Sequence, residues 1–239
     1  SLEAGGAQSM ALELARGLLE RGYEIRLVCL DADRDMRLPG TPEEQAALEA
    51  RIRILGQGRV RAPTLRKALG MRAQRHRLSR LIARESLALV ISFMDRANIL
   101  NLIANRAVPR ILSVRKHIGM SLSEKSAFKR GLIKLAYPII LGRADAIIFN
   151  SEESARDFVA RFPVDEQRVT VIRNSVSSKI RDLARREPEG EAAALLGPSC
   201  ILTVGRLKPV KAHFCLLRAF AKVVHAHPDA RLVIVGDGH

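Results

Sequence analysis

The stretch that decides the fold is Ile201-Leu-Thr-Val-Gly-Arg-Leu-Lys-Pro-Val-Lys211, which Arg231-Leu-Val-Ile-Val-Gly-Asp-Gly-His239 follows after a short interval. Each stretch begins with a mostly apolar run, Ile201-Leu-Thr-Val204 and Arg231-Leu-Val-Ile-Val235, which is typical of a strand covered on both faces of a parallel sheet. The residues between them carry apolar side chains at helical spacing. The pattern predicts a strand, a glycine turn carrying Arg206 and Lys211, a helix and a second strand, and two cations at such a turn suit a polyanionic ligand.

The same alternation of strand and helix extends through the earlier part of the chain. A helix beginning near Gly5-Gly6-Ala7-Gln8 is expected to end at Gly22, and a loop is expected over residues 32–50, where turn signals replace periodicity. The alternation predicts an α/β fold with an open parallel sheet. The expected strands are 24–31, 51–55, 88–93, 109–114, 144–149 and 168–172, and the expected helices among them include 63–84, 96–106, 124–141 and 151–162.

The domain organisation follows from where the strand pattern lapses. Arg, Glu, Ala, Gly and Pro dominate residues 177–198, which we interpret as a hinge or linker. We therefore expect residues 1–176 to form an N-terminal Rossmann-like domain, and residues 199–239 to begin a second one with its first βαβ unit. Since no strand precedes the first helix and the chain stops after a strand, we expect both domains to be truncated.

Composition limits the possible locations. Of the 239 residues 47% are apolar, but Trp is absent and aromatic residues make up only 4%, so the core is expected to be aliphatic. The sequence contains no run of 18 uncharged apolar residues, so no membrane span is predicted. Cys29, Cys200 and Cys215 lack metal-ligand spacing and are expected to be reduced. With no signal-peptide pattern, these features favour a cytoplasmic protein.

Charge indicates the kind of partner. The formal net charge of +15 favours anionic partners, and residues 59–84 alone hold nine Lys and Arg and no acid. Leucines recur at helical spacing in that segment, which predicts one apolar and one basic face. Such a helix either lies on an anionic membrane surface or packs as an ordinary surface helix on the sheet, and both readings stay open. No aromatic residues are interleaved and no nucleic-acid motif is present, so no nucleic acid is expected as a partner.

Several polar or glycine residues lie where ligands bind in parallel α/β folds. Gly5 and Gly6 open a helix, where backbone N–H groups either approach an anion or simply form a turn. Arg115 and His117 follow the strand expected at 109–114, and a histidine there acts as a general base, orients a substrate or is only solvated. Asn174 ends another strand with no clear helix after it, so it is expected to face a cleft.

Six segments occur in order along nearly the whole chain: Gly5-Gly6-Ala7-Gln8, Val90-Ile-Ser-Phe-Met-Asp-Arg-Ala-Asn-Ile99, Ile148-Phe-Asn-Ser-Glu152, Val171-Ile-Arg-Asn-Ser-Val176, Val204-Gly-Arg-Leu-Lys-Pro-Val-Lys211 and Val233-Ile-Val-Gly-Asp-Gly238. Taken together, and in this order, they resemble the group 1, family 4 retaining glycosyltransferases, which have the two-domain GT-B fold. The chain departs from the family pattern in two places, with Ala212 for a glycine and Arg173-Asn174-Ser175 for Pro-Asn-Gly.

The resemblance implies sugar transfer from a nucleotide-diphosphate-sugar donor to a saccharide or lipid-linked acceptor in glycan biosynthesis. Arg206 and Lys211 would neutralise the departing diphosphate, with Gly6 supplying a backbone N–H. Either His117 or Arg115 would take the place of a histidine found in many members. The family implies no cofactor other than the donor, which is a co-substrate, and no metal. With the basic surface, we expect the protein to act at the cytoplasmic face of the membrane.

Two other functions remain open at this level. A sugar-nucleotide epimerase has the same fold and would need acid/base carboxylates in its cleft. A non-catalytic module that binds anions or lipid would lack the two glutamates of the family's donor site, which we expect beyond residue 239. For the same reason the chain alone is expected to be inactive.

Overall fold

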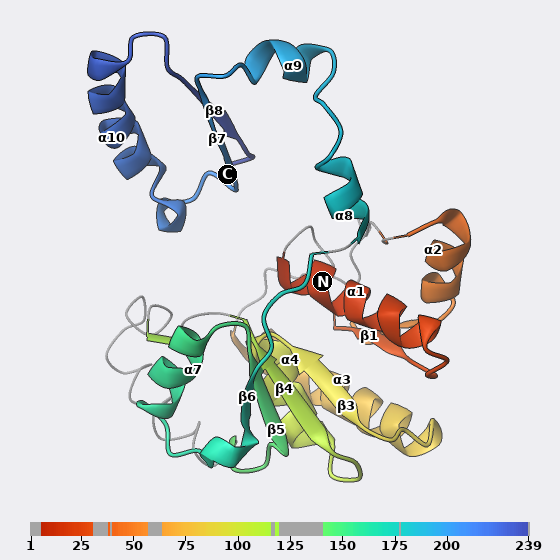
Figure 1. The fold of residues 1–239 in the computed structure, drawn as a ribbon. Coiled ribbons are helices and arrows are strands. Elements are labelled where there is room, and N and C mark those ends of the chain that lie inside the picture. The colour runs from red at the N-terminus through yellow and green to blue at the C-terminus, as the bar shows by residue number, and fades with distance from the viewer. Residues whose placement is uncertain are drawn as a thin grey trace. The chain divides into compact units, whose positions relative to one another are not determined.

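The computed structural model describes residues 6–30, 38, 40–56, 64–115, 118–119, 141–176 and 178–238. It divides into two compact units, Ser1–Ser175 and Val176–His239 (Figure 1). All strand pairs in the described parts are parallel. The predicted α/β class with parallel sheets is therefore confirmed.

The first unit is built around a four-stranded sheet with the order β3-β4-β5-β6. These strands are β3 (Val90–Phe93), β4 (Arg110–Val114), β5 (Ala146–Phe149) and β6 (Val169–Val171), the last preceded by the 3₁₀ turn η1 (Glu166–Arg168). Each lies within a predicted strand and is slightly shorter. Because the strands are parallel and in sequence order, their carboxyl ends meet at one edge.

Two helices contribute to one apolar core against this sheet. α4 (Asp95–Ala104) contributes Leu102, and α7 (Glu152–Val159) contributes Phe158. Both pack in the same cluster as Leu112 of β4, so the two helices cover the same face. The other buried members of the cluster are Val114, Ile118, Leu141, Ala144, Ile147, Phe149, Ala155 and Phe162.

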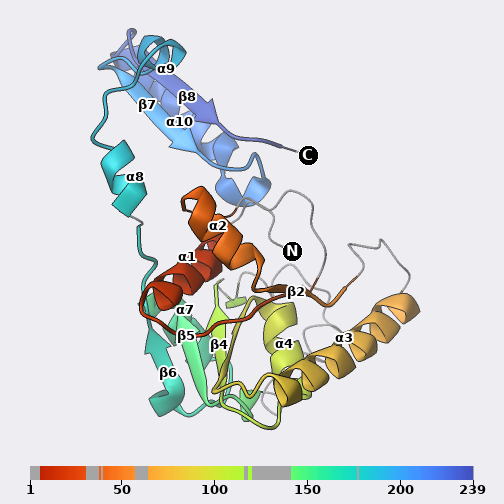
Figure 2. The ribbon, with the colours of Figure 1, turned by 90° about the vertical axis from the view of Figure 1, so that its right-hand side faces the viewer.

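α3 (Thr64–Arg84) lies beside α4 and confirms the helix predicted from Pro63 to Arg84 (Figure 2). Leu78 and Ile82 of α3 are buried in a second cluster with Leu100 of α4. The apolar stripe of this basic helix therefore packs on the rest of the unit, as one of the two readings proposed. None of the helices in the described ranges is long and apolar enough to cross a membrane.

The N-terminal part contains one element that the sequence interpretation missed. α1 (Gly6–Glu20) and the parallel pair β1 (Leu27–Cys29) and β2 (Ile52–Ile54) agree with prediction, but residues 42–49 form α2 (Pro42–Glu49). The loop expected over 32–50 is therefore wrong there, and residues 31–37 and 39 lie outside the description. Thr41 accepts a bond from the Glu44 N–H while Glu44 accepts one from the Thr41 N–H, a capping box, and Pro42 occupies the first turn.

The second unit contains the predicted βαβ arrangement. β7 (Cys200–Val204) pairs with β8 (Arg231–Val235), and α10 (His213–Ala226) connects them. The helix begins only at His213, because residues 209–211 form the 3₁₀ turn η2 (Pro209–Lys211) and Ala212 then adopts a left-handed conformation. The segment expected to be a linker holds two short helices, α8 (Ser178–Leu183) and α9 (Glu191–Leu195).

Asp145 joins the starts of two neighbouring strands. It accepts the Arg110 backbone N–H at 2.8 Å and the Arg110 Nε at 3.0 Å. Two hydrogen bonds hold the pKa of Asp145 below its ordinary value: the bond from the Arg110 backbone has the larger effect, and the bond from the Arg110 side chain comes second. A carboxylate with a depressed pKa stabilises the fold above its unfolded pKa, and this stabilisation is lost as the pH falls through the folded value.

We therefore expect Asp145→Asn to lower stability at pH 7 by up to about 1 kcal/mol, since the side chain is half exposed and solvent screens the pair. The gap between wild type and variant should close as the pH falls below about 4. Urea unfolding followed by circular dichroism between pH 3 and 7 measures this. A gap that stays constant over that range would contradict the assignment.

Candidate functional site

Arg115 follows β4 at the carboxyl edge of the sheet and connects several elements there. Its Nε donates to the Ser113 hydroxyl at 2.8 Å, and one of its terminal nitrogens donates to the Asn174 side-chain oxygen. The guanidinium carbon also lies 5.4 Å from the centre of the Phe93 ring, within cation–π range. The structure thus brings together two of the residues singled out from the sequence, Arg115 and Asn174.

Burial gives the Arg115 guanidinium an unusual environment for a cation. Desolvation lowers the pKa of Arg115 from its ordinary value. The group remains charged near neutral pH because an arginine pKa starts far above it. A partly desolvated cation whose position is set by Ser113, Asn174 and Phe93 is suited to hold an anionic or polar group of a ligand.

The polypeptide next to Arg115 is also specialised. Met94 has φ 73°, a region that costs a bulky side chain free energy, and its N–H donates to the Ser113 carbonyl at 3.3 Å. The Asn98 amide donates to that same carbonyl at 3.2 Å. The backbone that presents Ser113, and with it Arg115, is therefore held from two positions of the β3–α4 segment.

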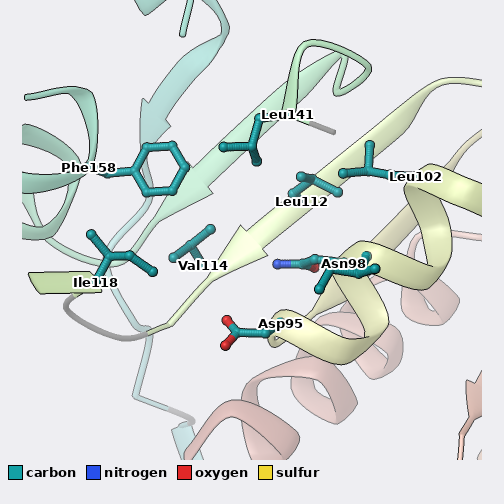
Figure 3. Close-up of a pocket in the computed structure, with 9 residues that line it drawn as sticks. Asp95, Asn98, Leu102, Leu112, Val114, Ile118, Leu141 and Phe158 are labelled. Atoms are coloured by element: carbon teal, nitrogen blue, oxygen red, sulfur yellow. The ribbon is translucent and has the colours of Figure 1, made fainter. Parts of the chain in front are cut away.

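Figure 3 shows the pocket beside this edge, with Asp95 and Asn98 at one end and apolar side chains around the rest. The Asn98 side-chain oxygen is buried there and has no hydrogen-bond partner among the described residues. The volume open to a ligand is only about 20 Å³, which fits one water molecule. Ligand pockets of drug-sized molecules start near 300 Å³, so this pocket is not a sugar site in the form described.

Three other expected site residues belong to the first unit, namely Gly5, Gly6 and His117. Gly5 and His117 lie outside the described residues. Gly6 is the first residue of α1 and is exposed, and a Cβ added there would meet open space. Its expected role at an anion therefore depends on its backbone N–H at the helix start and stays a prediction.

In the second unit, Arg206 and Lys211 lie on the turn that leads from β7 to α10. Both side chains are exposed, and neither has an ion pair or side-chain hydrogen bond within the described part of the chain. The Lys211 Cε lies 4.0 Å from the position that a Cβ on Gly205 would occupy. The aliphatic part of the lysine side chain therefore passes over that glycine. The structure thus leaves two unneutralised cations together at the carboxyl end of a parallel strand, where ligands of such folds bind.

His213 fixes the backbone of this turn. Its Nε2 lies 3.2 Å from the Arg206 carbonyl oxygen, which requires a proton on that nitrogen if it donates. The preceding Ala212 has φ 52°, where a residue with a Cβ costs about 1 kcal/mol more than glycine. This conformation gives a physical reason for a glycine at that position in the family pattern.

Gly236 allows the two strands of the second unit to end in close contact. A Cβ on Gly236 would lie 1.9 Å from the Gly205 carbonyl oxygen, whereas a Cβ on Gly197 would meet nothing within 4 Å. Beyond this point the Leu207 N–H donates to the Asp237 carbonyl at 2.8 Å. The end of β8 therefore supports the turn that carries Arg206.

We expect Gly236→Ala to push the Gly205–Arg206 backbone aside and to weaken binding of a nucleoside diphosphate at least tenfold. Titration calorimetry of the full-length variant measures this affinity. Gly197→Ala is the matched control and should bind as wild type does. Equal affinity in all three proteins would show that the contact does not position the turn.

Sequence reasoning did not find every residue in these arrangements. Ser113, Asn98, His213 and Gly236 act through contacts with residues that are distant in sequence or on another element. Asn98 and Gly236 lie inside segments quoted for the family resemblance, which was the one available signal for them.

Comparison with known proteins supplies the family. Residues 4–179 match Glycosyltransferase Family 4, and residues 187–239 match Glycosyl transferases group 1. A crystal structure of a glycosyltransferase from Rickettsia africae superposes with a TM-score of 0.61 at 14% identity, covering 99% of this chain and 66% of that one. The apo lipopolysaccharide outer core galactosyltransferase WaaB gives 0.56 at 16% identity, with the same coverage. These two likenesses support the GT-B fold.

Two curated relatives are similar in sequence. N-acetylgalactosamine-N,N'-diacetylbacillosaminyl-diphospho-undecaprenol 4-alpha-N-acetylgalactosaminyltransferase of Campylobacter jejuni is 25% identical over 244 residues, covering 100% of this chain and 61% of the relative. D-inositol 3-phosphate glycosyltransferase of Nocardia farcinica is 32% identical over 105 residues, covering 41% of this chain and 22% of the relative. The chain thus spans less than two thirds of either relative. Since one family match covers most of its residues, the chain belongs to Glycosyltransferase Family 4.

Proposed function

We propose that the whole protein transfers a sugar from a nucleoside-diphosphate-sugar donor to a saccharide or lipid-linked acceptor in glycan biosynthesis. We further propose that the transfer retains the anomeric configuration and needs no metal at the diphosphate. The observation that carries the proposal is the β7–α10 turn, where Arg206 and Lys211 are exposed at the end of a parallel strand and form no ion pair with any residue that the structure describes. Family membership supports the reaction class.

The proposed role of the turn is electrostatic. As the bond between the sugar and the diphosphate breaks, negative charge grows on the leaving group. Arg206 can bind two phosphate oxygens at once, and Lys211 adds a compact charge. These two cations offset the growing charge in the transition state, a role that a divalent metal takes in other enzymes. The contact of His213 with the Arg206 carbonyl limits the movement of this turn.

On the first unit, we assign Arg115 and Asn174 to a polar ligand group at the sheet edge, with Gly6 and His117 as further proposed contacts. The desolvated guanidinium of Arg115 favours an anionic or strongly polar partner. The Campylobacter jejuni relative, whose name specifies a diphospho-undecaprenol acceptor, supports a lipid-linked acceptor here.

The experiment incubates full-length protein with a set of nucleoside-diphosphate sugars and a lipid-linked saccharide in the presence of EDTA. Mass spectrometry of the acceptor should show the gain of one sugar, and NMR of the product should show the donor's anomeric configuration. Epimerised donor with unchanged acceptor would instead identify a sugar-nucleotide epimerase. No change in either would favour a non-catalytic binding module.

The second candidate activity, binding to the cytoplasmic face of the membrane, is favoured by the basic face of α3. Arg72, Arg75, Arg80 and Arg84 are exposed there. The adjacent acid, Glu85, is already bound to Arg26 at 2.7 Å and so does not neutralise them. Each cation near an anionic surface contributes about 1 kcal/mol of attraction.

A further inference from the structure

A groove lies between α3 and the C-terminal end of α4, two helices that contact each other and are both labelled in Figure 2. Its volume of about 360 Å³ is within the range of ligand sites. Ile82, Ala83, Ile103 and Ala107 give it an apolar lining. The two charged residues that line it, Arg75 and Arg106, come from the two sides of the groove.

The charged residues that line the groove are all positive. Arg75 and Arg106 are both exposed, and within the described ranges neither forms an ion pair or a side-chain hydrogen bond. Two neighbouring arginines, in contrast, do form side-chain hydrogen bonds. Arg77 donates to the Leu55 carbonyl at 2.6 Å, and Arg96 donates to the Gln74 side chain at 2.9 Å. Two like charges beside one apolar groove repel each other unless an anion lies between them.

The remaining polar group of the groove is already satisfied. The Ser79 hydroxyl donates to the Ala104 carbonyl at 2.6 Å. This bond satisfies one of the carbonyls at the end of α4 that have no partner within the helix. What the groove offers a ligand is therefore two cations and an aliphatic surface. This combination matches a phosphate attached to a hydrocarbon chain, whereas a free phosphate gains nothing from the aliphatic part.

We propose that this groove binds one anionic phospholipid, with its phosphate at Arg75 and Arg106 and the first part of an acyl chain along Ile82, Ala83, Ile103 and Ala107. The proposal deepens the membrane-surface proposal for α3 and is independent of sugar transfer. Its consequence is a defined lipid site on α3, in addition to the general attraction of a basic surface. Arg72, one turn before Arg75 on the same helix, adds to the attraction.

The first test measures binding of the full-length protein to vesicles of phosphatidylcholine with a quarter phosphatidylglycerol. The double variant Arg75→Gln/Arg106→Gln should bind at least tenfold more weakly. The control Arg143→Gln/Arg156→Gln removes the same net charge from two exposed arginines elsewhere on the first unit and should lose less than threefold. Equal losses in the two double variants would overturn the site in favour of diffuse surface charge.

The second test examines the apolar part without changing charge. Ala83→Gln/Ala107→Gln should also weaken vesicle binding, whereas Ala73→Gln, at an exposed position of α3 outside the groove lining, should not. Monomeric dihexanoyl phosphatidylglycerol should compete with the vesicles and glycerol phosphate should not. Equal competition by both would mean a simple anion site, and vesicle binding unaffected by the Ala83/Ala107 change would remove the acyl-chain assignment.

Two further readouts separate this proposal from its rivals. Sedimentation velocity should give the same mass for wild type and Arg75→Gln/Arg106→Gln; loss of a dimer in the variant would mean that a second copy occupies the groove. Sugar transfer to a water-soluble acceptor should be unchanged in the variant. Since vesicle binding needs no donor, failure of the transferase proposal would leave this test intact.

Discussion

Replacing Arg206 or Lys211 by alanine is expected to lower kcat/KM for the donor by about 10²–10³, the usual loss for one group that stabilises charge in a transition state. The physical reason is that each exposed cation would otherwise meet the diphosphate as its charge grows. Arg206→Lys should recover only part of the loss, because an ammonium group cannot bind two phosphate oxygens in a fixed geometry. Steady-state kinetics of the full-length enzyme, with varied donor, measure the effect.

Lys208→Ala is the matched control for this prediction. Lys208 is exposed on the same turn and its loss removes the same charge, but the resemblance assigns it no role. The control should change kcat/KM less than threefold. If Lys208→Ala caused the same loss as Arg206→Ala, general attraction of the donor by the basic turn would replace specific contacts as the explanation.

Phe158→Ala is expected to destabilise the first unit by about 3–5 kcal/mol, since it removes a large buried ring and leaves a cavity. The Phe158 side chain is 1% exposed, and its ring centre lies 5.0 Å from those of both Phe149 and Phe162. These contacts connect α7 to β5 in the interior beneath the candidate site. Thermal and urea unfolding of the purified variant give the size of the loss.

Tyr23→Ala serves as the comparison in the same unit, because its side chain is 60% exposed. It should change stability by less than about 1 kcal/mol. A small loss for Phe158→Ala, similar to that of Tyr23→Ala, would mean that the cluster of three phenylalanines is not a main source of the first unit's stability.

The fold was largely predictable because parallel strands covered on both faces leave a simple trace in sequence. Runs such as Ala88-Leu-Val-Ile-Ser-Phe93 are almost entirely apolar, which is typical of such strands. α2 was not predicted, because Thr41-Pro42 is both a turn signal and a helix start. The outcome depended on the bond between Thr41 and Glu44 and on Leu48, which is fully buried against the rest of the unit.

The candidate site was predictable only where its residues lie close together in sequence at the end of a single strand. Arg206 and Lys211 lie on a single turn, so their proximity followed from spacing. The bond between Arg115 and Asn174 joins residues 59 positions apart, and sequence placed each at a strand end without pairing them. The contacts of His213 and Gly236 depend on the left-handed Ala212 and on a close approach of two backbones, which local patterns do not encode.

The proposed sugar transfer depends on the β7–α10 turn binding the diphosphate of a nucleotide sugar through Arg206 and Lys211 without a metal. Calorimetric titration of the full-length protein with nucleoside diphosphates, with EDTA and then with Mg²⁺, tests it most directly. We expect binding of equal affinity under both conditions and its loss in Arg206→Ala/Lys211→Ala. Binding that requires Mg²⁺, or that survives the double substitution, would contradict it.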